Sequence, residues 1–206
     1  MNIHFAGTEL AALIVATSFA AGLNTYATIA TLGLLSRAGA LTLPGSLHLV
    51  SSWWVIGACL ALFTIEFFAD KIPAFDLVWN ALHTFVRVPI AALLAFKATS
   101  SLSPQMQLIS ALAGAAISFA AHGGKTAVRA AITPSPEPVS NIALSAGEDV
   151  LAVGLTWFAT RHPYTSAGIA IVLVVIIVIL TRWIIRALRK LFRGAENVIA
   201  SSHSSA

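Results

Sequence analysis

Charged residues and cysteine are scarce in this 206-residue chain. Both shortages limit the class of protein to which it can belong. Charged residues make up 10% of the sequence and hydrophobic residues 58%, with a mean hydropathy of +0.87. Soluble domains contain about 25% charged residues, so this composition predicts a membrane protein. The single Cys59 excludes an intramolecular disulfide.

The N-terminus lacks the positive segment that opens a secretory signal peptide. No Lys or Arg precedes the apolar run over residues 10–35. That run is also longer than a signal-peptide core. We therefore expect it to remain as the first transmembrane helix.

Six apolar stretches are long enough to span a bilayer, which takes about 20 helical residues. They cover residues 9–36, 52–69, 75–96, 104–132, 139–160 and 164–188. Proline-containing breaks separate most of them. The sequence predicts an all-α transmembrane bundle of about six helices, with one domain over residues 1–193 and a flexible cytoplasmic tail over 194–206.

Positive charge is concentrated after the last stretch. Residues 1–180 hold seven Lys or Arg and seven Asp or Glu, whereas five basic residues follow: Arg182, Arg186, Arg189, Lys190 and Arg193. Basic residues beside a span mark the cytoplasmic side and contact anionic lipid, which argues against nucleic acid as a partner. With an even number of spans, both termini are expected in the cytoplasm.

A short sequence that occurs twice suggests an internal repeat. The sequence SFAA at residues 18–21 recurs at 118–121. Two three-helix repeats over 9–98 and 104–192 would have opposite orientations, as in many transporters. The alternative is chance similarity in an alanine-rich sequence.

Ionisable residues inside the apolar stretches are the candidate functional site, because such groups are costly in lipid unless they pair or act. Asp76, His83 and Arg87 share one face of the third stretch, and His122, Lys125 and Arg129 share one face of the fourth. Carboxylates lie at Glu66, Asp70, Glu148 and Asp149. Pairing the basic face of the fourth stretch with Glu66, Asp70 and Glu148 would balance the interior charge.

Three hypotheses follow from these residues. The leading one is a small-solute or ion transporter or channel coupled to protons, in which Glu66, Asp70 or Glu148 takes up the proton and the basic residues face a small anion. The second is a non-catalytic scaffold or lipid-binding subunit held by interhelical ion pairs. The third is an intramembrane enzyme on lipid phosphates with His83 or His122 as acid or base, although no HExxH, GxSxG or GxxxxGK[ST] motif occurs. No cofactor or metal is expected, and a homodimer would suit a protein of this size.

Several short sequence motifs together resemble those of a family of bacterial multi-pass membrane proteins, Domain of Unknown Function 4126. They are AGLNTY at 21–26, ADKIP at 69–73 with Asp76, His83-Thr84 with Arg87, His122 with Lys125 and Arg129, SPEP at 135–138 with Ser140-Asn141, Glu148-Asp149 and His162-Pro163. The resemblance implies an integral inner-membrane protein and assigns no activity. Lys71, which is one of the charged residues in the apolar region from Gly57 to Ala95, and Asn141 complete the candidate binding or proton-coupling residues.

Overall fold

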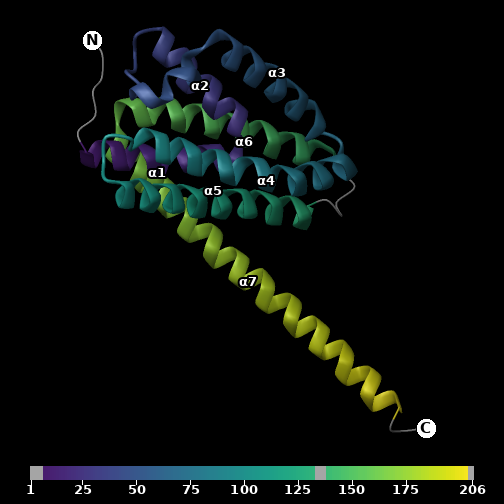
Figure 1. The fold of residues 1–206 in the computed structure, drawn as a ribbon. Helices are drawn as coiled ribbons and strands as arrows, with labels where there is room; N and C mark the ends of the chain where they lie inside the picture. The colour runs from purple at the N-terminus through teal and green to yellow at the C-terminus, as the bar shows by residue number, and fades with distance from the viewer. Residues whose placement is uncertain (1–6, 133–137, 204–206) are drawn as a thin grey trace.

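The computed structural model is an all-helical bundle (Figure 1). It describes residues 7–132 and 138–203, and within these the side chains of all but 45, 73–77, 130–132, 138–141, 184, 187, 188 and 190–203. The helices are α1 (Gly7–Leu23), α2 (Thr25–Arg37), η1 (Gly45–Ser51), α3 (Trp53–Ala69), α4 (Pro73–Ala98), α5 (Pro104–Ile132), α6 (Pro138–Arg161) and α7 (Pro163–His203). No strand occurs in the described ranges, so the all-α prediction is confirmed.

The predicted first span, residues 9–36, is divided at Asn24 into α1 and α2. Asn24 has extended backbone angles, and its Oδ1 accepts a hydrogen bond from the Ala27 amide, 2.9 Å away, as an N-cap of α2. Leu13 of α1 and Leu32 of α2 line the same small cavity, so α2 folds back alongside α1. The single continuous helix expected here was wrong, because a buried asparagine caps a new helix within the apolar run.

The other predicted spans correspond to α3 through α7. Within the described residues, four helices have the length and composition to cross a membrane: α4, α5, α6 and α7. The α1 and α3 helices are shorter apolar helices of 17 residues each. The count of six spans is therefore not confirmed. The α7 helix continues through Gly194 to His203, beyond the predicted end of the helical domain at residue 193.

Small residues allow α1, α4 and α5 to approach closely. A Cβ at Gly22 would lie 2.5 Å from the Ser118 carbonyl oxygen of α5, and one at Gly114 would lie 2.9 Å from the Cβ of Ala95 in α4. Helices in lipid associate through such close packing, because burial of apolar surface offers little gain there. The contact places the end of α1 against the middle of α5.

The same contacts set the direction of α1 relative to α5. Ser18 lies beside Gly114, and Gly22 beside Ser118, so the two helices run parallel. Inverted repeats would place these two helices antiparallel. The repeat predicted over 9–98 and 104–192 is therefore not confirmed.

The start of α1 and the end of α7 lie far apart, on opposite sides of the bundle (Figure 1). The start of α1 meets the start of α7, where Thr8 Oγ1 and the Tyr164 hydroxyl are 2.7 Å apart. From there α7 crosses the bundle and projects beyond it (Figure 1). The even number of crossings that placed both termini in the cytoplasm assumed one span over residues 9–36, and the hairpin removes that basis.

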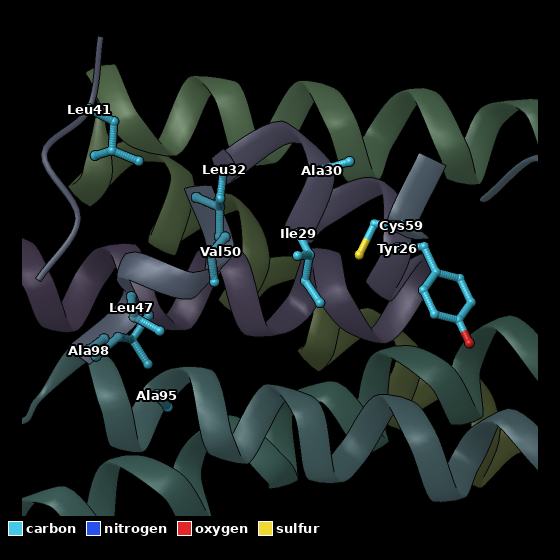
Figure 2. Packing of buried hydrophobic residues seen from close by; sticks show 11 residues of the cluster. Tyr26, Ile29, Ala30, Leu32, Leu41, Leu47, Val50, Cys59, Ala95 and Ala98 are labelled. Atoms are coloured by element: carbon cyan, nitrogen blue, oxygen red, sulfur yellow. The ribbon is translucent and has the colours of Figure 1, made fainter. Parts of the chain in front are cut away.

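Apolar side chains on both sides of the α1–α2 hairpin hold it in the bundle. Figure 2 shows the cluster that joins α2 to η1, α3 and the end of α4, from Leu41 to Tyr26. A second cluster joins α1 to α5, α6 and α7 around the buried Phe19. Other helices thus pack on both faces of the hairpin, and Asn24 at its tip is fully buried.

Candidate functional site

Ionisable side chains from α3, α4, α5 and α6 gather around the hairpin tip at Asn24. The members of this cluster, called the tip cluster below, are Glu66, Asp70, Arg87, Lys125, Arg129, Glu148 and Asp149. Six of them are at most 7% exposed, and the Glu148 side chain is 12% exposed. Buried charges need partners to offset the loss of hydration, so the pairing within the cluster determines what it can do.

Arg87 joins the cluster to the broken end of α1. Its Nη2 forms an ion pair with Glu66, and its Nη1 donates to the Leu23 carbonyl at 2.9 Å and the Gly22 carbonyl at 3.3 Å. Carbonyls at a helix C-terminus lack intrahelical donors and carry partial negative charge. The guanidinium therefore satisfies the α1 end and a carboxylate together.

Lys125 and Arg129 are shared among three carboxylates. Lys125 Nζ lies 3.1 Å from Asp70 Oδ2, 3.2 Å from Glu148 Oε2 and 3.6 Å from Glu66 Oε1. Arg129 Nη2 pairs with Asp70 Oδ2 at 2.9 Å and also with Glu148. With Arg87, three cations thus balance three carboxylates. The sequence predicted such pairs for the basic face of the fourth stretch, and the structure adds Arg87 of the third stretch as the third cation.

Asp149 is a fourth carboxylate in the cluster. Its Oδ1 accepts a hydrogen bond from Asn24 Nδ2 at 2.8 Å, and the residue is 7% exposed. Its Oδ2 is buried without a hydrogen-bond partner among the described residues, and no described cation lies within 4 Å of the carboxylate. Asp149 is therefore held by a neutral amide where its neighbour Glu148 is held by two cations.

Both central histidines are fixed by their neighbours. His122 Nδ1 lies 3.0 Å from Arg87 Nη1, which can only donate, so Nδ1 accepts and the ring is neutral. His122 Nε2 then donates toward the Asn80 carbonyl, 2.9 Å away. His83 Nδ1 donates to the Trp79 carbonyl at 2.8 Å, and its Nε2 lies 3.1 Å from the Tyr26 hydroxyl.

Of three further predicted residues, the structure describes the side chain of Lys71. Lys71 Nζ donates to the Phe67 carbonyl at 2.7 Å and lies 3.0 Å from the centroid of the Phe67 ring. The side chains of Asp76 and Asn141 lie outside the described residues. All seven members of the tip cluster were thus among the predicted site residues, and His122, also predicted, contacts one of them, Arg87.

The sequence analysis did not identify Asn24 or the carbonyl groups at the end of α1 as parts of the site. The available signal was an asparagine directly before Thr25 inside an apolar run, since Asn is a preferred N-cap. The carbonyls of Gly22 and Leu23 carry no sequence signal, because any residue supplies one.

A groove between α3 and α6 reaches the cluster. It has a volume of about 570 Å³ and is lined by Phe63 and Phe67 of α3 and by Asp149, Val150 and Val153 of α6. Asp149 is the most buried of these lining residues. Among the described residues, no group of three or more His, Cys, Asp or Glu has a geometry that could hold a metal ion.

Apolar helices long enough to span a bilayer, packed around buried ion pairs, define an all-helical transmembrane protein. Residues 11–183 match a family model described as Domain of unknown function (DUF4126), and the chain belongs to this family. The resemblance found in the sequence is thereby confirmed. No curated protein and no solved structure matches the chain.

Proposed function

We propose that the protein is a proton-coupled transporter of a small solute or ion in the bacterial inner membrane, and that the α1–α2 hairpin is its moving element. The observation that carries the proposal is the helix break at Asn24, which places non-helical backbone against buried charges. Non-helical backbone at membrane depth is tolerated only within protein or beside a water-filled cavity. Broken helices of this kind form the binding sites of many transporters.

Asp149 is the proposed proton carrier. Glu66, Asp70 and Glu148 each pair with an arginine or lysine, so a proton on any of them would leave a buried cation without its counter-ion. Protonation of Asp149 leaves no buried cation without its counter-ion, because Asp149 forms no ion pair with any described residue. The charged groups that act on Asp149 include Lys125, Glu66 and Asp70 of the cluster and Lys71 of the α3–α4 turn.

The bond between Asp149 and Asn24 couples the proton to the hairpin. An amide donor binds a carboxylate more strongly than it binds a neutral carboxyl group. Protonation of Asp149 therefore weakens the bond at 2.8 Å that holds the hairpin tip against α6. The tip is released when the proton binds and is held again when the proton leaves.

The cluster as it stands represents the closed state of the pathway. Each of Arg87, Lys125 and Arg129 already pairs with a carboxylate. A small anionic solute would have to displace one of these carboxylates, and the intermediate exposure of Glu148 favours its pair with Arg129 as the place of exchange.

Flux in proteoliposomes tests the proposal. The purified protein is reconstituted with an imposed proton gradient and tested against a panel of small anions, small cations and amines. Asp149→Asn is expected to lower gradient-driven flux at least tenfold while leaving the melting temperature within a few degrees of the wild type. Glu9→Gln, which removes an acid at the start of α1, is the matched control and should transport normally. Gradient-driven flux in Asp149→Asn equal to the wild type would contradict the assignment.

One observation favours the second candidate function, a scaffold without transport. The equal number of cations and carboxylates in the paired part of the cluster is what helix adhesion alone would require. On that account the panel gives no flux, and removal of charge changes stability only.

A further inference from the structure

The groove between α3 and α6 combines an apolar wall with a buried acid. Phe63, Phe67, Val150, Val153 and Gly154 line its length, and Val150 and Val153 are exposed on the outer surface of the bundle. Because α6 has the length and composition of a membrane span, we expect this opening to face the hydrocarbon. A molecule dissolved in the bilayer can therefore enter the groove sideways.

The polar end of the groove carries negative charge. Asp149 lines it, and its Oδ2 is buried without a hydrogen-bond partner among the described side chains. Counting Asp149, the tip cluster holds four carboxylates against the three cations Arg87, Lys125 and Arg129. Lys71 forms no ion pair with Asp149, because its ammonium is held on the carbonyl and ring of Phe67, and it acts on the carboxylate only from a distance.

We infer that the groove binds an amphiphile with an apolar tail and a protonated amine head. The ammonium donates a hydrogen bond to Asp149 Oδ2 and balances the fourth carboxylate, while the tail lies between Phe67 and Val153. This amine is a different solute from the small anion considered at the pair of Glu148 with Arg129, and the inference rests on the proposed function for transport. The binding step stands on the groove and the carboxylate alone.

Other head groups fit the same groove less well. A phosphate or carboxylate head would place a second negative charge beside Asp149, at a depth where charge repulsion is weakly screened. A hydroxyl head could donate one hydrogen bond but would not balance the charge. An uncharged tail would fill the apolar wall and leave Oδ2 without a donor.

Photolabelling at equilibrium tests the inference in the full chain in nanodiscs. The probe is an alkylamine with a twelve-carbon tail that carries a diazirine, and the labelled peptides are mapped by mass spectrometry. We expect labels on the α3 and α6 residues of the groove, and competition by dodecylamine at least tenfold stronger than by dodecanol or dodecyl sulfate. Equal competition by all three would overturn the amine assignment, and labels spread evenly over α7 would overturn the site.

Two variants test separately the role of the Asp149 carboxylate and the role of the groove volume in binding. Asp149→Asn is expected to weaken labelling at least tenfold, with folding checked by its melting curve. Val153→Trp fills the groove without changing any charge and should abolish labelling, whereas Val172→Trp on the exposed side of α7 should have no effect. Labelling of Val153→Trp at the wild-type level would overturn the site even if the Asp149 variant proved unstable.

The outcomes also separate this inference from the transport proposal. Amine binding at Asp149 without any proton-linked flux would refute transport and leave the site intact. Proton-linked flux of a small ion without amine binding would refute the site and leave transport intact.

Discussion

Arg87 shows how a single buried side chain links two kinds of structure in this protein. It is fully buried and contacts Glu66, two α1 carbonyls and His122. An arginine can satisfy so many acceptors because its guanidinium carries five donors and stays charged. The residue is therefore central both to the ion pairs and to the helix break.

Removal of Arg87 should be costly, and removal of its partner should offset part of that cost. Arg87→Met leaves Glu66 as a buried charge without its guanidinium, and we expect a loss of about 3 kcal/mol or more in unfolding free energy. Adding Glu66→Gln should recover part of the loss, but not the contribution from the α1 carbonyls.

Unfolding in detergent with increasing sodium dodecyl sulfate measures both effects. Arg161→Met at the exposed end of α6 is the control and should change stability little. A double variant that is no more stable than Arg87→Met would show that the ion pair itself contributes little.

Much of the tip cluster could be predicted from residue spacing. Lys125 and Arg129 are one helical turn apart, and their pairing with Asp70 and Glu148 follows from charge balance in an apolar medium. The spacing could not predict that Glu148 and Asp149, which are adjacent, would have different partners. That difference depends on Asn24, 125 residues away in the chain.

At the scale of elements, the α1–α2 hairpin depends on one asparagine with two roles. Asn24 Oδ1 caps α2, and Asn24 Nδ2 binds Asp149. Asn24→Ala removes both bonds, and we expect a loss of about 1–3 kcal/mol.

Asn24→Asp separates the two roles. It keeps the cap but replaces the amide donor with a second carboxylate against Asp149, so we expect a larger loss than for Asn24→Ala at pH 8 and a smaller difference near pH 5, where a proton can be shared. Thermal unfolding at the two pH values measures this. Equal stability of the two variants at both pH values would contradict the assigned bonds.

Close packing of α1 against α5 gives a second prediction for this element. A Cβ at Gly22 would lie 2.5 Å from the Ser118 carbonyl oxygen, so Gly22→Ala should destabilise by about 1–3 kcal/mol through overpacking.

Gly57→Ala in α3 is the matched control for Gly22→Ala. Nothing lies within 4 Å of its added Cβ, and alanine favours a helix over glycine, so Gly57→Ala should be neutral or stabilising. The stabilities of Gly22→Ala and Gly57→Ala are compared by measuring their melting temperatures in the same detergent. A neutral Gly22→Ala would contradict the close contact of the two helices.

The helices were predictable where local signals end them, and the hairpin was not. Prolines begin α4, α5, α6 and α7, and the predicted boundaries there lie within two residues of the observed starts. The break at Asn24 lies in an unbroken apolar run with no proline, and it is stabilised by Arg87 and Lys125 from distant helices. Such long-range partners cannot be identified from a single sequence.

At the scale of the whole molecule, the bundle has one end near the start of α7 and another toward its basic extension (Figure 1). Ser103 lies in the exposed α4–α5 connection, and Arg189 is exposed near the far end of α7. Because basic residues mark the cytoplasmic side, we expect these two positions on opposite sides of the membrane.

Cysteine labelling tests this orientation. In a Cys59→Ala background, Ser103→Cys should react with a membrane-impermeant maleimide only in right-side-out vesicles, and Arg189→Cys only in inside-out vesicles. Reaction of both positions from the same side would contradict a complete crossing by α7.

Hydrogen–deuterium exchange at the hairpin tip tests the central claim, which is that a proton on Asp149 releases Asn24. After correction for intrinsic rates, amides around residues 22–28 should exchange faster at pH 5 than at pH 8 in the wild type. In Asp149→Asn they should exchange fast at both values. Exchange at the tip that is independent of pH in the wild type, or unchanged by Asp149→Asn, would contradict the coupling of proton and hairpin.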